Sequence, residues 1–187
     1  MDCQLEAGQW LYVAGANGVG KTSLLRMVCG LASIEAGDIL WNGTPIHAQR
    51  EVYRQDLCYL GHLNALQESM TVDENLAFST ALGGFVIDPA QTQAVLTRFG
   101  LRGRGTQLVR HLSQGQKRRV ALSRLAMSPA KLWVLDEPYV AMDEAGIGLL
   151  ADLIAKHLGA GGLAVLTSHQ RVPIGNVPAQ MLELQAP

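Results

Sequence analysis

The sequence predicts an α/β fold in which helices cover both faces of a mostly parallel sheet. Short apolar segments with the length of buried strands recur at residues 9–14, 57–60, 132–135 and 163–166. The segment after the first of these has helical spacing, with apolar residues at Leu24, Leu25, Val28 and Leu31. Strands that alternate with helices are typical of parallel sheets, because each crossover places a helix on a face of the sheet.

The middle of the chain, roughly residues 70–110, predicts a compact helical insert. Thr71 and Glu74 have the spacing of a capping box, in which each side chain bonds the backbone N–H of the other residue. A second helix is expected to open at Asp88, because Pro89 suits the first helical position, where no N–H is needed. The strand pattern resumes only after this insert.

Composition excludes several classes of protein. The chain has 187 residues, 48% of them hydrophobic, which is enough for a domain with its own core and excludes a disordered chain. A net charge of −1 lacks the basic excess of a nucleic-acid binder, so no nucleic-acid partner is expected. No stretch approaches the ~20 apolar residues of a membrane span, and residues 1–10 do not have the pattern of a signal peptide. Cys3, Cys29 and Cys58 are widely spaced, which suits a reducing compartment and argues against a zinc site.

A P-loop pattern, GxxxxGKT, joins the first predicted strand to the first predicted helix. Glycines allow the backbone to wrap around phosphates with its N–H groups pointing inward, and the helix N-terminus adds positive potential. Lys21 supplies a full charge at the β- and γ-phosphates, and the Thr22 hydroxyl suits Mg²⁺. A chance glycine-rich turn is the alternative, which the flanking elements disfavour. The predicted phosphate site comprises Gly15, Ala16, Asn17, Gly18, Val19, Gly20, Lys21, Thr22 and Ser23.

Two acidic residues, Asp136 and Glu137, end the apolar segment 132–135. The carboxyl end of a buried parallel strand is where ligands bind in such sheets. We therefore expect Asp136 to hold Mg²⁺, directly or through water, and Glu137 to polarise the attacking water as general base. A solvated helix cap is the alternative for this pair, and the P-loop favours the catalytic interpretation.

The stretch from Leu112 to Gln116 reads LSQGQ, and a basic-faced helix is predicted after it, with Val120, Ala121 and Leu125 facing inward. Here the sequence resembles the ATP-binding cassette (ABC) ATPases, whose signature motif is LSGGQ. The motifs also follow the order of that family: P-loop, signature, Asp-Glu strand and then a histidine. The resemblance covers nearly the whole chain.

In that family, two subunits pair head to tail around two ATP molecules, and each signature motif contacts the γ-phosphate held by the partner. The resemblance implies that Ser113, Gly115 and Gln116 act in this way, with the serine hydroxyl and a backbone N–H placed at a helix N-terminus. Gln114 replaces a glycine of the family motif. We expect an ordinary backbone conformation there, so that the replacement is tolerated.

Two further positions match family motifs. His169 corresponds to the switch histidine, which contacts the γ-phosphate and helps to set the hydrolytic geometry; a solvated loop histidine is the alternative. Asp143 lies in a segment that resembles the family's D-loop. It could reach across the dimer or cap the helix that Gly159 is expected to end, and both roles can hold.

The chain departs from the family at two places. A glutamine that ligates Mg²⁺ and faces the membrane partner usually ends the strand at 57–60, whereas here His62 takes that position. Imidazole can bind a metal or hold a water, and a surface histidine near the cleft is the alternative. The family's adenine-stacking aromatic residue lies further upstream than the 14 residues that precede Gly15. We therefore expect modest discrimination between ATP and GTP.

The resemblance implies the ABC ATPase form of the P-loop NTPase fold, with a mostly parallel sheet, a small antiparallel β region and a helical subdomain. The Asn42-Gly43 pair is a turn signal beside a strand. One ATP-binding domain is expected to span residues 1–187, with the helical subdomain at approximately 70–127.

Several stretches are similar to the ATP-binding subunits of bacterial haem exporters used in cytochrome c maturation. They are Gly18–Arg26, Tyr59–His62, Gly115–Leu125, Leu132–Pro138 and Gly161–Gln170, of which Tyr59–His62 discriminates most sharply. The resemblance implies a transport ATPase that uses ATP and Mg²⁺ and forms a homodimer. It would work at the cytoplasmic face of the inner membrane, with integral permease subunits on separate chains. The alternatives are a subunit of another ABC importer or exporter, a soluble ABC ATPase without a membrane partner, and a P-loop kinase.

Overall fold

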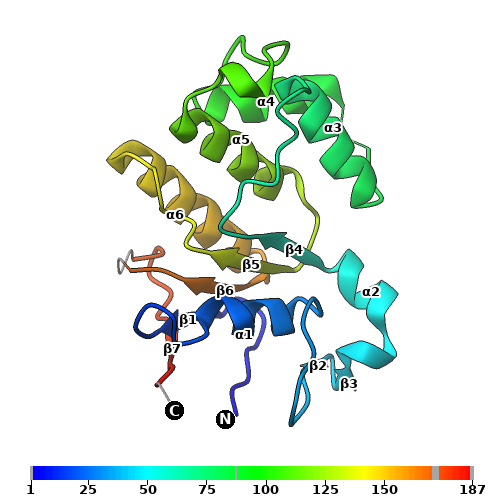
Figure 1. Ribbon diagram of the computed structural model, residues 1–187, viewed down its shortest axis with the longest axis vertical. Coiled ribbons are helices and arrows are strands. Elements are labelled where there is room, and N and C mark those ends of the chain that lie inside the picture. The colour runs from blue at the N-terminus through cyan, green and yellow to red at the C-terminus, as the bar shows by residue number, and fades with distance from the viewer. Residues whose placement is uncertain (1, 87, 170–172, 186–187) are drawn as a thin grey trace. The chain divides into compact units, whose positions relative to one another are not determined.

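The computed structural model describes residues 2–86, 88–169 and 173–185 (Figure 1). Its chain divides into two compact units. The first unit contains the main sheet and comprises residues 1–62, 130–138 and 154–187. The second unit is helical and comprises residues 63–129 and 139–153. Within the described ranges, no helix combines the length and the apolarity that crossing a bilayer requires.

The sheet of the first unit has the strand order β4-β5-β6-β1-β7, and every neighbouring pair is parallel. Its strands are β1 (Trp10–Ala14), β4 (Leu57–Leu60), β5 (Leu132–Asp136), β6 (Leu163–Thr167) and β7 (Gln180–Glu183). Thr167 of β6 is in register with Asp136 of β5 and with Val13 of β1. The carboxyl ends of these three strands therefore lie at one edge, where parallel α/β sheets bind ligands.

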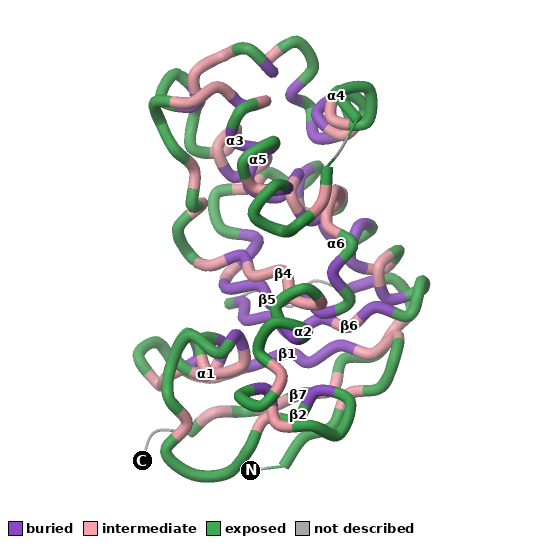
Figure 2. The backbone as a smooth tube through the Cα atoms, turned by 90° about the vertical axis from the view of Figure 1, so that its right-hand side faces the viewer, coloured by how far each residue is buried: buried purple, intermediate pink, exposed green. Residues whose placement is uncertain are grey.

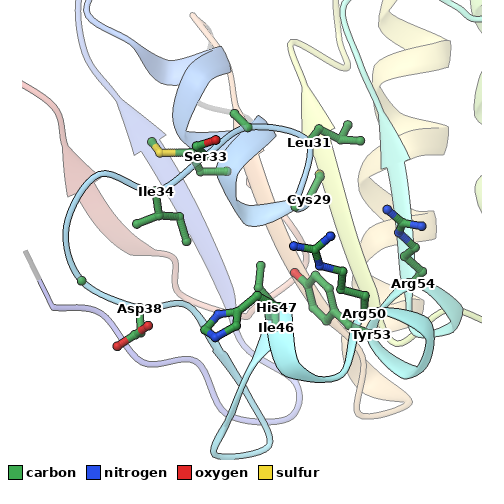
Figure 3. A pocket seen from close by; sticks show the side chains of 14 residues that line it. Cys29, Leu31, Ser33, Ile34, Asp38, Ile46, His47, Arg50, Tyr53 and Arg54 are labelled. Carbon is green, nitrogen blue, oxygen red and sulfur yellow. The ribbon is translucent and has the colours of Figure 1, made fainter.

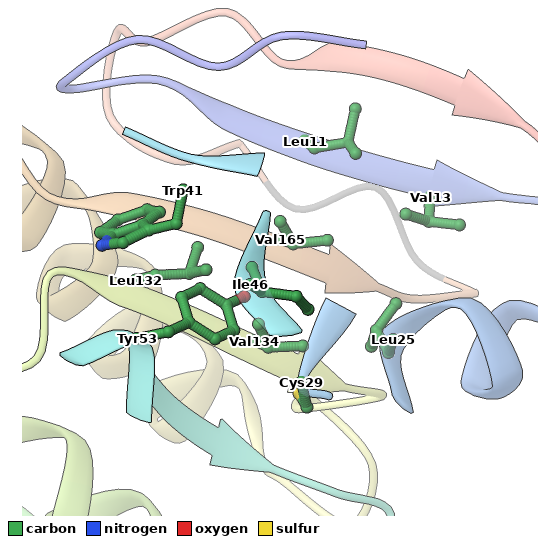
Figure 4. Close-up of a cluster of buried hydrophobic side chains, with 10 residues drawn as sticks. All are labelled: Leu11, Val13, Leu25, Cys29, Trp41, Ile46, Tyr53, Leu132, Val134 and Val165. Atoms are coloured by element: carbon green, nitrogen blue, oxygen red, sulfur yellow. The ribbon is translucent and has the colours of Figure 1, made fainter. Parts of the chain in front are cut away.

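One face of the sheet packs against α1 (Lys21–Val28), the helix that follows β1. Leu25 of α1 is fully buried in a cluster with Val13, Val134 and Val165, which come from three strands (Figure 4). Residues two apart on a strand point to the same face, so the apolar strands present a continuous surface to this helix. The packing holds the N-terminal end of α1 near the carboxyl edge of β1.

Short elements complete this cluster. They are β2 (Leu40–Trp41), β3 (Thr44–Pro45), the 3₁₀ turn η1 (Ile46–Ala48) and α2 (Arg50–Gln55). β2 and β3 pair antiparallel, and the turn between them contains Asn42 and Gly43, both with positive φ. Trp41 and Tyr53 contribute buried rings that meet edge to face, with their centroids 5.7 Å apart.

The opposite face of the sheet packs against the C-terminal part of α6 (Glu144–Gly159). His157 of α6 stacks on Trp133 of β5, with the ring centroids 3.8 Å apart and the planes 6° from parallel. Its Nε2 lies 3.1 Å from the carbonyl oxygens of Lys131 and Leu163. Because both partners are acceptors, Nε2 carries a hydrogen and the imidazole joins the starts of β5 and β6.

The second unit contains α3 (Val72–Leu82), α4 (Pro89–Arg98), the 3₁₀ turn η2 (Val109–His111), α5 (Gln114–Met127) and the first part of α6. α5 packs against both α3 and α4. Its apolar side chains Val120, Ala121 and Leu125 are buried, as predicted, and Figure 2 shows these helices with buried and exposed stretches alternating. Arg118 is buried as well, so the predicted basic face of α5 is not wholly solvated.

The α/β fold class expected from the sequence is confirmed, including the parallel sheet and the small antiparallel sheet. The Thr71–Glu74 capping box is present, and Asp88 caps α4 with Pro89 at its start. Sequence reasoning did not anticipate α2 or β7. Both are short and expose apolar as well as polar residues, as Val52 and Met181 show, so neither has a clear apolar periodicity.

Candidate functional site

The P-loop occupies the turn between β1 and α1 and depends on glycines. Gly15, Gly18 and Gly20 have φ values of 146°, 80° and 105°, which residues other than glycine rarely adopt. A Cβ at Gly18 or Gly20 would meet no atom within 4 Å, so the loop opens onto free space at both positions. Ala16 and Asn17 are exposed at the tip of the loop. This geometry suits a backbone cradle for an anion.

Lys21 is the first residue of α1, and its side chain folds back over the loop. Its Nζ donates to the carbonyl oxygens of Gly15 at 2.7 Å and Ala16 at 3.1 Å. The residue is nearly buried, so a full positive charge sits in the loop beside the helix N-terminus. Ser23, which follows Thr22 on the exposed side of α1, is also at this end of the helix.

Asp136 at the end of β5 is only 1% exposed and accepts hydrogen bonds from two hydroxyl groups. Thr22 Oγ1 donates to its Oδ2 at 2.9 Å, and Thr167 Oγ1 donates to its Oδ1 at 2.8 Å. A carboxylate beside a threonine hydroxyl is a hard oxygen donor set of the kind that Mg²⁺ prefers, with further positions for water and phosphate oxygens. The residues present therefore fit Mg²⁺.

Glu137 follows Asp136 and lies against His169. The backbone N–H of His169 donates to Glu137 Oε2 at 3.3 Å, and His169 Nε2 lies 3.3 Å from Glu137 Oε1. The glutamate side chain is 14% exposed, whereas that of the histidine is 55% exposed. Glu137 has a φ of 48°, in the left-handed region that residues with a side chain adopt rarely. The first unit thus brings together a carboxylate and an imidazole at the edge that holds the P-loop.

His62 is exposed just beyond the end of β4, which is paired with β5. Among the described residues, no hydrogen bond or ion pair connects its ring with Asp136 or Thr22. The part of the chain that the structure describes also contains no cluster of three or more histidine, cysteine or acidic side chains suited to a metal. The predicted role of His62 as a metal ligand stays a prediction.

The signature residues lie in the second unit, at the start of α5. Ser113 caps this helix: its Oγ accepts from the N–H of Gln116 at 3.2 Å, and Gln116 Oε1 accepts from the N–H of Ser113 at 2.9 Å. Gln114 begins the helix and is not among the residues with positive φ, in agreement with the expected ordinary backbone. Gly115 is in the first turn, so its N–H points out of the helix end.

Asp143 performs the capping role that was one of its two predicted roles. Its Oδ1 accepts from the N–H of Gly146 at 3.0 Å, and Nη2 of Arg119 donates to its two carboxylate oxygens at 2.7 and 2.8 Å. These hydrogen bonds hold the pKa of the Asp143 carboxyl below its usual range. Arg119 belongs to α5, so the pair joins the signature helix to the D-loop segment within the second unit.

Sequence reasoning missed two residues that support the site. Thr167, described above, also accepts at its Oγ1 from the N–H of Glu137 at 3.0 Å. Tyr12 of β1 donates its hydroxyl to the carbonyl oxygen of Ser168 at 2.5 Å, immediately before His169. The only signal for Thr167 was a polar residue at the end of an apolar strand. Gln170, the last residue of the similar stretch Gly161–Gln170, lies outside the described residues.

A pocket of about 500 Å³ lies at the opposite end of α1 from the P-loop. Figure 3 shows its lining, which includes Cys29, His47, Arg50 and Arg54. Burial raises the pKa of the Cys29 thiol to about 12, so the thiol remains protonated near neutral pH. The pocket is lined from the C-terminal end of α1 onward and is separate from the phosphate site.

Known proteins resemble this chain over most of its length. A family model described as ABC transporter matches residues 1–140. The cytochrome c biogenesis ATP-binding export protein CcmA of Albidiferax ferrireducens is 78% identical, and the match covers 100% of this chain and 89% of the relative. Proteins of the same name from Dechloromonas aromatica and Escherichia coli are 49% and 41% identical, and the matches cover 96% of this chain and 86% and 85% of those proteins.

Solved structures agree with this relationship. An ABC transporter ATP-binding protein from Pyrococcus furiosus superposes with a TM-score of 0.82 at 25% identity, covering 96% of this chain and 86% of the other. The ATP-binding subunit of another ABC transporter gives a TM-score of 0.78 at 25% identity, covering 88% and 69%. The chain belongs to the ABC transporter family, and within it to the cytochrome c biogenesis ATP-binding export proteins.

Proposed function

We propose that this chain hydrolyses ATP as a subunit of a haem exporter that serves cytochrome c biogenesis. The observation that carries the proposal is the hydrogen bond from Thr22, at the end of the P-loop, to Asp136. The residue after Asp136, Glu137, is held in turn by His169. Each group has the type and the surroundings that phosphoanhydride hydrolysis needs: a charged phosphate cradle, hard oxygen ligands and a carboxylate base.

The P-loop binds the phosphates of the nucleotide. The backbone of residues 15–20 and the start of α1 direct N–H groups toward the phosphates, and Lys21 contributes its charge at the β- and γ-phosphates. Thr22 and Asp136 would hold Mg²⁺, and when bound the ion neutralises charge that develops on the phosphate oxygens. Ser23 lies at the same helix end.

Glu137 and His169 carry out the hydrolytic step, Glu137 as the base and His169 as the residue that orients it. The oxygen of a water molecule forms a bond to the γ-phosphorus while the bond from that phosphorus to the β–γ bridging oxygen breaks. The water proton passes to the Glu137 carboxylate, and ADP and phosphate leave. His169 holds Glu137 through its backbone N–H and its ring, so it orients the base and stands beside the site of the γ-phosphate.

Two copies of the chain pair head to tail in this account, and the second unit supplies the contacts in trans. The Ser113 hydroxyl accepts a bond inside its own capping box, so its hydrogen can donate to a phosphate oxygen. The N–H groups of Gly115 and Gln116 extend this donor set at the N-terminus of α5. Closure around ATP and opening after hydrolysis would drive the partner subunits.

The transport role rests on the relatives, whose name states ATP-binding export in cytochrome c biogenesis. We infer integral permease subunits on separate chains, a peripheral position at the cytoplasmic face of the inner membrane, and no nucleic-acid partner. Co-purification from detergent-solubilised membranes tests this part. Permeases of cytochrome c maturation in the complex support it, whereas permeases of another transporter, or none, contradict the haem assignment.

Glu137→Gln tests the catalytic part. The amide keeps the volume and can still accept from the His169 N–H, but it cannot take a proton, so we expect turnover to fall about 10²–10⁴-fold with ATP binding retained. Nucleotide-bound dimer should accumulate, as measured by size-exclusion chromatography with ATP. Turnover at the wild-type rate would show that Glu137 is not the general base.

A further inference from the structure

Thr167 is the last residue of β6 and is completely buried. It stands in register with Asp136 on the neighbouring strand, and its side chain reaches that strand's end. The steps assigned to Lys21, Glu137 and His169 do not include Thr167, and Thr167 does not belong to the signature motif. Its placement between two acidic residues with different roles is therefore informative.

The hydroxyl of Thr167 makes two hydrogen bonds, one as a donor and one as an acceptor. It donates to Asp136 Oδ1 at 2.8 Å and accepts from the backbone N–H of Glu137 at 3.0 Å. A hydroxyl has one hydrogen, so donation to the carboxylate leaves its lone pairs for the amide. One oxygen atom thereby fixes both the carboxylate of Asp136 and the backbone that begins Glu137.

Glu137 needs such a restraint because its φ of 48° is uncommon for a residue with a side chain. The amide bond to Thr167 holds the peptide plane that precedes this conformation. Thr22 anchors the other carboxylate oxygen of Asp136, so the carboxylate is held from both sides. Loss of the Thr167 hydroxyl would leave one side of that carboxylate and the Glu137 amide without this partner.

We propose that Thr167 is a positioning residue that sets the metal-binding carboxylate of Asp136 and the base Glu137 relative to each other. This inference rests on the proposed function and goes beyond it by coupling two roles through one hydroxyl. Removal of the hydroxyl should slow the chemical step and weaken Mg²⁺ binding. Affinity for nucleotide without Mg²⁺ should be kept, because the Lys21 amine is held by the carbonyl oxygens of Gly15 and Ala16.

The test compares four versions of the full chain: wild type, Thr167→Val, Thr167→Ser and Thr80→Val. Thr80 offers a matched control because it is also a buried threonine, but its hydroxyl donates only to the Ala77 carbonyl within α3. Thr167→Ala serves if valine prevents folding, as judged by circular dichroism and thermal unfolding. The readouts are kcat and KM for ATP hydrolysis, the Kd for ATP, and the Mg²⁺ concentration that half-maximally raises Tm in the presence of a non-hydrolysable ATP analogue.

For Thr167→Val we expect kcat to fall at least about tenfold, since small misplacements of a base are costly, with the Kd for ATP in EDTA within about twofold of wild type. The half-maximal Mg²⁺ concentration should rise about tenfold, and Thr167→Ser should recover both values to within about threefold. Thr80→Val should match wild type.

Two results would overturn the positioning role: a folded Thr167→Val or Thr167→Ala with wild-type kcat and Mg²⁺ dependence, or a Thr167→Ser as impaired as the valine variant. The second result would show that packing of the methyl group matters rather than the hydroxyl. Failure of the proposed function is distinguishable, because it would appear in the wild-type chain and in the co-purified complex as the absence of both ATP binding and hydrolysis.

Discussion

Gly15→Ala should damage the P-loop more than any other alanine substitution of its glycines. A Cβ at this position would lie 2.8 Å from Val19 Cγ1 and 2.9 Å from the carbonyl oxygen of Leu184, well inside the ~3.5 Å of a carbon contact. The φ of 146° adds strain of about 1–3 kcal/mol, and the overpacking adds about 1–3 kcal/mol. We expect a total loss of about 2–6 kcal/mol in the free energy of unfolding.

Gly18→Ala is the matched control for the part of the free-energy loss that comes from the close contacts at Gly15. The Gly18 φ of 80° is also positive and strains alanine, but no atom lies within 4 Å of the added Cβ, so a loss of only about 1–2 kcal/mol is expected. Urea unfolding followed by circular dichroism measures both values, provided that the slope of free energy against urea is unchanged. Equal destabilisation of the two variants would show that the close approach to Leu184 has no energetic consequence, contrary to this prediction.

Two further predictions concern histidines. His62→Ala should lower ATP hydrolysis or its stimulation by membrane partners, and unchanged values of both would show that His62 does not take the place of the family glutamine. Burial lowers the pKa of His157, so the fold favours the neutral ring; its contribution to stability is complete above the unfolded pKa of about 6.5 and is lost as pH falls below it. The Tm of His157→Phe should therefore fall less than that of wild type between pH 7.5 and 5.5, and parallel curves would contradict this assignment.

The elements that sequence predicted well are those whose signal is local. Residues 57–60 form β4 with the predicted bounds, because an apolar run of four residues has the length of a strand and is too short for a typical helix. The strand lies at the edge of the sheet, and of its four residues Leu60 alone is buried. Asp143 and Gly159 bound α6 as expected, since capping chemistry depends on residues a few positions apart. β7 was missed because its exposure does not follow its polarity: Leu182 is half-buried, whereas the equally apolar Met181 is exposed.

In the candidate site, too, the residues with a local signal could be predicted from the sequence and the others could not. The P-loop could be predicted because its backbone is contiguous and its glycines are required by the turn itself. Thr167 and Tyr12 could not, because their partners lie 31 and 156 positions away in the sequence. Only the parallel register of β1, β5 and β6 brings these groups together, and that register is set by packing of the sheet against α1 and α6.

The proposed mechanism requires a pocket that two copies of the chain complete together. Lys21→Ala removes from one copy the lysine charge that binds the phosphates, and Ser113→Ala removes the serine hydroxyl from the other. Each variant alone should have little ATP hydrolysis, whereas a mixture should regain activity, because a mixed pair contains one pocket in which both residues are intact. Activity of the mixture equal to the average of the two separate variants, with no ATP-dependent mixed dimer, would contradict the shared pocket.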